Sequence, residues 1–301
     1  MEQSHGYRAF GLNILSCLEI PYWPPGAPPW DVVIERGGVP RELPGAEVLW
    51  EGRCQARIGA CLIDFAQAGR MLIEGGRRVV VEPAQDSVPA WFVTLLATTG
   101  FAAVMYQRGG LCLHASAVAR GGRAYLVAGP SGAGKSTTAS ALLKHGCHFI
   151  SDDVTMITPR PDGGFDATAS HPTVRLNADS HAVLDLAATA ATEIRADLDQ
   201  KFQLRYLGLR AEKPERIARI CFLENDPGLA RPRTLPLLGQ ERVGALQRNL
   251  FRRGLARAVA DPAKLAALGI ALAQEVEVVR LTRPTSGFML DELCALVLDE
   301  T

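Results

Sequence analysis

Residues 129–136 read Gly-Pro-Ser-Gly-Ala-Gly-Lys-Ser and stand between an apolar run, Ala124–Ala128, and a helical stretch that ends at Lys144. This segment matches the phosphate-loop pattern in full. Its glycines let successive backbone N–H groups curl around a phosphate, its lysine reaches the β and γ oxygens, and its serine hydroxyl can ligate Mg²⁺. The loop therefore predicts bound ATP and Mg²⁺, with Ser136 at the metal. The residues expected to bind the nucleotide are Gly129, Ser131, Gly132, Ala133, Gly134, Lys135, Ser136 and Thr137.

The chain from Leu111 onward has the texture of an α/β nucleotide-binding core. A strand, the glycine loop, a helix and a second strand at 148–150 follow one another, and this order is typical of such cores. Further apolar runs at 217–223 and 276–281 predict two more strands. Helical stretches are expected around them, at 180–198 and 240–274.

The N-terminal part has a different sequence pattern. Short β-branched runs predict strands, and Gly75-Gly76 favours a hairpin between the last two of them. We expect a small antiparallel sheet here, followed by helices at 88–107, where apolar residues recur at helical spacing. The sequence thus predicts a β-rich N-terminal domain over residues 1–87 and a catalytic domain over residues 88–301. The strand-like runs lie at 31–34, 56–63, 70–73 and 78–81.

Composition limits the partners and the location. Lys plus Arg and Asp plus Glu both total 32, so the chain has no global positive field to recruit nucleic acid or an anionic membrane. The seven cysteines are scattered without a C-x-x-C pair, which favours reduced thiols over a disulfide framework. No uninterrupted apolar run approaches the roughly 20 residues that span a bilayer. We therefore expect no nucleic acid, no membrane and a cytoplasmic protein.

Two further features can carry chemistry beside the loop. Asp152 and Asp153 close the strand after the loop helix, at the end where open α/β sheets place ligands. Adjacent residues on a strand point opposite ways, so one carboxylate could hold Mg²⁺ and the other accept a proton; the alternative is a surface turn with two solvated acids. His114 lies on the strand before the loop strand, linked to it by a hairpin at 120–123. A purely structural hydrogen-bonding role is the alternative for this histidine.

Taken in order, His114, the glycine loop and the Asp-Asp pair resemble the HPr kinase/phosphorylase family. The spacings, 21 residues from His114 to Lys135 and 17 from Lys135 to Asp152, are also similar to that family's. The resemblance implies a P-loop kinase core of the HPr kinase and phosphoenolpyruvate carboxykinase type. It also implies an ATP-dependent serine kinase in which Asp152 is the general base, Asp153 helps to hold the metal and phosphates, and His114 orients the base.

The acceptor expected from this resemblance is a small protein or peptide that carries a serine. HPr kinases follow the Asp-Asp pair with a signature containing Glu, Arg and glycines, which is not found between residues 175 and 225. The chain is more similar to divergent relatives found with peptide-maturation systems, some of which phosphorylate precursor peptides. HPr kinase/phosphorylase proper, a nucleotide-binding regulatory module without phosphotransfer, and a small-molecule or carboxykinase-like enzyme remain as alternatives.

A second cation opposite Lys135 would offset charge on the transferred group. The candidates for contacts to phosphate or substrate are Arg175 and Lys201, with ordinary surface cations as the alternative. The resemblance to HPr kinases, which form oligomers, also allows a homo-oligomer.

Overall fold

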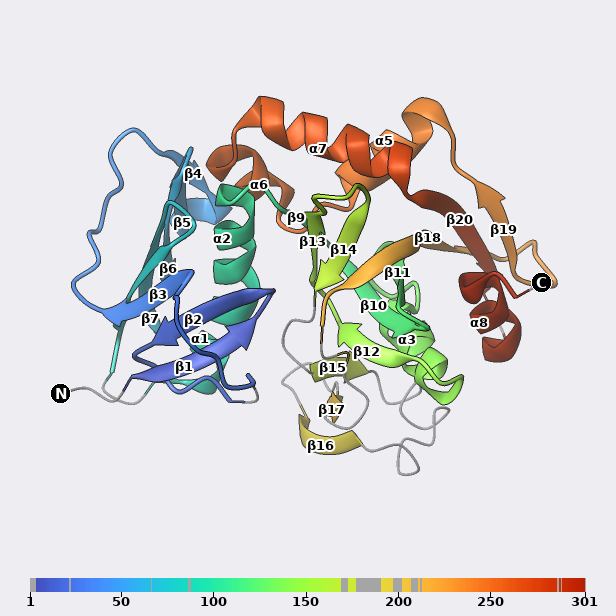
Figure 1. Ribbon diagram of the computed structural model, residues 1–301, viewed down its shortest axis with the longest axis horizontal. Helices are drawn as coiled ribbons and strands as arrows, with labels where there is room; N and C mark the ends of the chain where they lie inside the picture. The colour runs from blue at the N-terminus through green and yellow to red at the C-terminus, as the bar shows by residue number, and fades with distance from the viewer. Residues whose placement is uncertain are drawn as a thin grey trace. The chain divides into compact units, whose positions relative to one another are not determined.

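The structure is a computed structural model, and it divides into two compact units (Figure 1). The first unit comprises Met1–Cys112 and Leu250–Leu268, and the second comprises Leu113–Asn249 and Gly269–Thr301. Each unit is described by itself. The structure describes residues 4–21, 23–65, 67–85, 88–168, 173–176, 191–196, 202–206, 211, 213–285, 287 and 289–300.

An eight-stranded sheet in the order β1-β2-β3-β8-β7-β6-β5-β4 forms the first unit. The glycine turn at 75–76 joins β7 to β8 as an antiparallel hairpin, as expected. However, β3 runs parallel to both β2 and β8, so the sheet is mixed and larger than the small antiparallel sheet expected. The strands are β1 (His5–Ala9), β2 (Leu12–Ser16), β3 (Val32–Arg36), β4 (Glu47–Leu49), β5 (Cys54–Arg57), β6 (Ala60–Phe65), β7 (Gly69–Glu74) and β8 (Arg78–Pro83), with the 3₁₀ turn η1 (Trp50–Gly52) between β4 and β5.

The helices of the first unit come from two distant parts of the chain. The run α1 (Ala90–Leu95), η2 (Leu96–Gly100) and α2 (Phe101–Gln107) is helical, as the apolar spacing predicted. Its side chains from Phe101 to Tyr106 are buried, and α2 packs against β7. Helix α6 (Arg253–Val259) packs against α2 and β5. This division differs from the boundary expected after residue 87, because these helices bury their apolar faces on the N-terminal sheet.

The same helical run, Ala90–Gln107, is long and apolar enough to cross a membrane by length and composition. In the structure, 67% of it is buried. The core helix of a soluble protein has the same features, and the packing of α2 on β7 accounts for this burial.

An aromatic cluster holds α2 to the N-terminal strands. The ring of Phe101 is fully buried, stacks on Phe10 at 4.7 Å between centroids, and meets Trp23 edge-on at 5.1 Å. Truncating a buried phenylalanine removes this packing and leaves a cavity. We expect Phe101→Ala to lower the free energy of unfolding of this unit by about 3–5 kcal/mol. Denaturant unfolding followed by tryptophan fluorescence measures the change.

Val48→Ala is the matched control for that prediction. Val48 is 66% exposed on β4, so its truncation is expected to cost less than about 0.5 kcal/mol. A loss below about 1 kcal/mol for Phe101→Ala would contradict the packing described.

The second unit is built on a nine-stranded sheet in which β12-β10-β11-β18-β14-β13-β9 are neighbours and β20 pairs with both β18 and β19. The turn at Gly121-Gly122 has positive φ at both residues, and it joins β10 to β11 as the expected hairpin. The strands are β9 (Leu111–Leu113), β10 (Ala115–Arg120), β11 (Arg123–Ala128), β12 (His148–Ser151), β13 (Thr155–Pro159), β14 (Phe165–Thr168), β18 (Glu215–Asp226), β19 (Arg233–Pro236) and β20 (Glu277–Pro284).

Strands β11, β12, β13, β18 and β20 point the same way. Strand β18 is parallel to β11 and β20, and β10 is antiparallel to both β11 and β12. The carboxyl ends of β12, β11, β18 and β20 therefore meet at one edge of the sheet, which is where open α/β sheets bind ligands.

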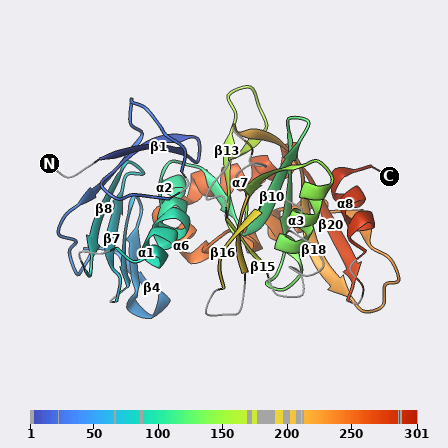
Figure 2. The ribbon, with the colours of Figure 1, turned by 90° about the horizontal axis from the view of Figure 1, so that it is seen from below.

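Helices cover one face of this sheet. Helix α3 (Lys135–Lys144) and helix α8 (Leu290–Leu298) lie beside the sheet (Figure 2). Their apolar residues are buried in one cluster with side chains of β11, β18 and β20. Helix α5 (Gly239–Arg248) and helix α7 (Pro262–Glu275) complete the helices over 240–274 that the sequence predicted, together with α6. The strand-to-helix step from β11 to α3 thus rests on a buried core, which fixes the loop between them.

A three-stranded antiparallel sheet follows β14. Its order is β15 (Thr173–Leu176), β17 (Phe202–Tyr206) and β16 (Ala191–Ala196). Residues 191–196 are therefore a strand, and the helix expected over 180–198 is wrong there. The segment Ala-Thr-Glu-Ile-Arg-Ala pairs with β17, so cross-strand pairing overrides the helical propensity of its alanines.

Candidate active site

The glycine loop, residues 129–136, leaves the carboxyl end of β11 and enters α3. Gly129 has a φ of 141°, and a Cβ added to it would lie 2.4 Å from the carbonyl oxygen of Leu223. Gly134 has a φ of 107° and immediately precedes the helix. Only glycine fits both positions without strain. The loop therefore passes close to β18 and then turns sharply, so that the positive end of α3 lies beside it.

Lys135 folds back over the loop. Its Nζ donates hydrogen bonds to the carbonyl oxygens of Gly129, at 3.0 Å, and Pro130, at 3.2 Å. The residue is only 8% exposed, so its ammonium group lies within the loop rather than in bulk water. A phosphate bound in the loop would offer this cation a charged acceptor in place of two neutral carbonyls.

Asp152 connects three separate segments of the second unit. Its Oδ1 accepts hydrogen bonds from the hydroxyl of Ser116 on β10, at 2.5 Å, and from the hydroxyl of Ser136 on α3, at 2.9 Å. The Ser136 hydroxyl also lies 3.2 Å from Oδ2. The carboxylate is half-buried directly after β12. The first aspartate of the pair is thus fixed beside the serine that the loop pattern assigns to Mg²⁺.

Asp153 makes different contacts from its neighbour. Nδ1 of His114 lies 2.8 Å from the backbone carbonyl oxygen of Asp153 and 3.2 Å from its Oδ1. Because both atoms accept hydrogen bonds, Nδ1 carries a proton. Asp153 has a φ of 67°, which is rare for a residue other than glycine and is often found at functional sites. Its side chain is 49% exposed, so this carboxylate is accessible to a substrate.

The remaining predicted residues are Arg175 and Lys201. Arg175 lies on β15, opposite Gln203 of β17, and its side chain lies outside the described part of the chain. Lys201 also lies outside the described residues. The other predicted residues, His114, the loop residues 129–137 and Asp152-Asp153, come together at the carboxyl edge of the sheet.

Two residues of this site were missed from the sequence. Ser116 stands two residues after His114, and this alternation on a β-segment could have suggested that both face the loop. Arg283 donates a hydrogen bond from Nε to the carbonyl oxygen of Ala133, at 3.1 Å. The available signal was the position of Arg283 just after the strand predicted over 276–281. Parallel strands end at the same edge of a sheet, so this position indicates the edge that also holds the loop.

The donor set fits a magnesium site that is completed by a nucleotide. Among the described residues, no group of three or more His, Cys, Asp or Glu side chains is placed to hold a metal ion. Mg²⁺ needs no such cage, because it is commonly held by one or two protein oxygens together with phosphates and water. The Ser136 hydroxyl and the Asp152 carboxylate, 2.9 Å apart, supply that pair of oxygens.

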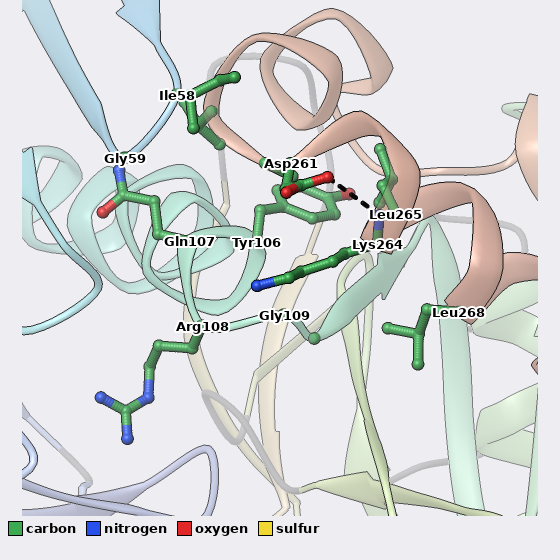
Figure 3. A pocket seen from close by; sticks show the side chains of 13 residues that line it. Ile58, Gly59, Tyr106, Gln107, Arg108, Gly109, Asp261, Lys264, Leu265 and Leu268 are labelled. Carbon is green, nitrogen blue, oxygen red and sulfur yellow. Dashed lines mark hydrogen bonds between the residues drawn. The ribbon is translucent and has the colours of Figure 1, made fainter.

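A cavity of about 330 Å³ in the first unit shares none of its lining residues with this site (Figure 3). Its charged lining residues are Arg108, Lys264 and Asp261. Arg108 also donates to the carbonyl oxygen of Gly76 and lies 3.5 Å from Asp31. The cavity therefore adds no residue to the site around the glycine loop.

Comparisons with known proteins give a match to a family model and similarities to solved structures. Residues 83–185 match the model of the family described as SynChlorMet cassette protein ScmC. This segment is about a third of the chain, and it includes His114, the glycine loop and the Asp-Asp pair. The HPr(Ser) kinase/phosphatase from Coxiella burnetii is similar over 63% of this chain and 95% of its own, with 12% sequence identity and a TM-score of 0.33. No curated protein matches the chain.

Proposed function

We propose that this chain is an ATP- and Mg²⁺-dependent kinase that transfers the γ-phosphoryl group to a serine hydroxyl of a small protein or peptide. One observation carries the proposal: a complete glycine loop, with its serine hydrogen-bonded to one aspartate, lies at the same sheet edge as a second aspartate in contact with a histidine. Phosphoryl transfer needs positioning and charge neutralisation above all, and these groups supply both.

The contacts support a different role for each aspartate, and these roles are the reverse of those implied by the family resemblance. Asp152 is hydrogen-bonded to Ser136, so we assign it to the metal. Asp153 is more exposed and contacts His114, so we assign it as the general base. His114 then acts as a positioning residue, because its Nδ1–H orients the Asp153 carboxylate and leaves an oxygen of that group for the substrate.

The proposed transfer of the phosphoryl group uses the loop and the two aspartates in the following way. The serine oxygen of the acceptor attacks the γ-phosphorus, the bond between that phosphorus and the β–γ bridging oxygen breaks, and ADP leaves. The serine proton passes to the Asp153 carboxylate. Lys135, already inside the loop, offsets the charge on the β and γ oxygens. Mg²⁺ supplies further neutralisation of the phosphates when it is bound beside Ser136 and Asp152.

A small peptide is the acceptor that we favour, with HPr itself as the alternative. The partial match to a cassette protein is compatible with an enzyme that modifies another gene product of the same cassette. We also propose a cytoplasmic location, where ATP is available and where the free cysteines of the chain remain reduced.

Label transfer tests the proposed reaction. The purified protein is incubated with Mg²⁺, ATP and candidate peptides, with the label placed either on the γ- or on the α-phosphate. We expect label from γ-labelled ATP alone to reach the peptide, and to be lost when the acceptor serine is replaced by alanine. ATP binding that requires Lys135, without transfer to any serine-containing acceptor, would instead identify a regulatory module.

Ser116→Ala tests how firmly Asp152 must be held. The substitution removes a 2.5 Å hydrogen bond to a carboxylate, and such bonds contribute about 1.5–3 kcal/mol. We expect the Mg²⁺ concentration for half-maximal transfer to rise by about tenfold or more, with the rate at saturating Mg²⁺ largely restored. Ser116→Thr keeps the hydroxyl and is the matched control. An unchanged Mg²⁺ requirement in Ser116→Ala would contradict the role given to Asp152.

A further inference from the structure

Arg283 lies at the carboxyl end of β20, at the same sheet edge as the glycine loop. In the order of the sheet, β18 and β20 lie on one side of β11, whereas β10 and β12 lie on the other. Asp152 and Asp153 follow β12. Arg283 therefore approaches the loop from the side opposite to the two aspartates.

The guanidinium group of Arg283 lies against the last turn of the loop. Its Nε donates to the carbonyl oxygen of Ala133, at 3.1 Å, and its Nη1 to that of Pro284, at 3.1 Å. Nη2 lies 3.5 Å from the point that a Cβ on Gly134 would occupy. The side chain thus fills the space that Gly134 leaves open, and it holds a cation beside the start of α3.

Within the described part of the chain, the charge of Arg283 is not offset by a neighbouring acid. Burial lowers the pKa of Arg283, and no carboxylate of the described residues forms an ion pair with it. Its neighbour on the same strand differs in this respect, because Arg280 pairs with Glu224 and Glu241. A half-buried cation without an acidic partner gains more from a bound anion than one that is already paired.

We infer that Arg283 binds the nucleotide on the side of the loop away from the transferred group, contacting the α- or β-phosphate through Nη2 while Nε fixes the loop at Ala133. This inference rests on the proposed function. It assigns the two ends of the nucleotide: the γ-phosphate lies toward Asp152 and Asp153, and the nucleoside end lies toward β18 and β20.

Binding of ATP and of ADP to the whole chain, measured by equilibrium dialysis with Mg²⁺ present, tests the inference. We expect Arg283→Gln to raise the Kd of both nucleotides by a similar factor, about tenfold or more, because the contact does not involve the γ-phosphate. The Kd values of Arg283→Lys should lie between those of the original protein and those of Arg283→Gln, since lysine keeps the charge but loses the planar guanidinium group. Arg280→Gln is the matched control and should bind both nucleotides normally.

The outcomes separate this inference from the proposal on which it rests. If the unchanged protein binds neither nucleotide, the proposed function fails. If it binds both and Arg283→Gln binds them equally well, Arg283 has no part in the nucleotide site. If Arg283→Gln weakens ATP but not ADP, the assigned direction of the nucleotide is wrong. If Arg283→Lys binds as weakly as Arg283→Gln and both melt at the same lowered temperature, the contact is structural only.

Discussion

Asp153→Asn is expected to lower the rate of phosphoryl transfer by about 10²- to 10⁴-fold, the range associated with loss of a general base. The asparagine keeps the size of the side chain and an oxygen that can accept the hydrogen bond from Nδ1 of His114, 3.2 Å away. It can no longer take the proton of a serine hydroxyl. Since Asp153 contacts His114, which stands outside the loop, the Kd of ATP should stay within about twofold. Single-turnover label transfer and equilibrium binding measure the two quantities.

Asp152→Asn is the matched comparison, since the two aspartates are adjacent and differ in their contacts. We expect it to raise the Mg²⁺ requirement, because Asp152 is the group hydrogen-bonded to Ser136. The rate at saturating Mg²⁺ should recover far more than in Asp153→Asn. The opposite pattern, with Asp153→Asn active and Asp152→Asn inactive at every Mg²⁺ concentration, would restore the assignment implied by the family resemblance, in which Asp152 is the base.

Lys135→Met is expected to reduce phosphoryl transfer by about 10²- to 10³-fold, the cost typical of removing one donor that stabilises a developing charge. Methionine has a similar length, but it cannot replace the ammonium group that lies 3.0 Å from the Gly129 carbonyl oxygen. ATP should also bind more weakly, because the cation within the loop is lost. Label transfer and equilibrium dialysis measure both effects, and circular dichroism checks that the variant is folded.

Lys144→Met provides the control for this substitution. Lys144 is the last residue of the same helix, and it is exposed. The Lys144→Met variant should transfer the phosphoryl group and bind ATP as the original protein does. Retention of normal transfer by Lys135→Met would contradict the role of the loop.

Local sequence signals predicted the segment from His114 to Asp153 well. Paired glycines at 121–122 require positive φ and so predict the hairpin, and Gly134 with Lys135 marks the start of α3. The strand after the helix follows from its apolar run. Each of these signals acts within a few residues, which is why pattern and structure agree there.

Pairings between distant segments could not be predicted in the same way. The parallel pairing of β3 with both β2 and β8 is not specified by the residues of these strands. Residues 191–196, within the helix expected over 180–198, form a strand because they pair with β17. The membership of 250–268 in the first unit is likewise decided by burial against elements far away in sequence.

The residues of the candidate site also fall into two groups, those indicated by local motifs and those brought in by contacts between distant segments. The glycine loop and the acidic pair are visible as motifs, but Ser116 meets Asp152 across 36 residues of sequence and Arg283 meets Ala133 across 150. The different contacts of the two aspartates depend on the left-handed backbone of Asp153, which no sequence pattern indicates. The motifs therefore indicated the candidate site, whereas the roles that we propose within it rest on the contacts of Asp152 and Asp153.

A crystal structure with Mg²⁺ and a non-hydrolysable ATP analogue tests the central claim most directly. We expect the triphosphate in the glycine loop, Mg²⁺ about 2.0–2.1 Å from the Ser136 hydroxyl with Asp152 bound to it directly or through one water, and the Asp153 carboxylate facing the γ-phosphate. Lys135 Nζ should have moved from the Gly129 carbonyl oxygen to the phosphate oxygens. A nucleotide bound away from the loop, or a metal held by Asp153 with Asp152 turned aside, would contradict the account.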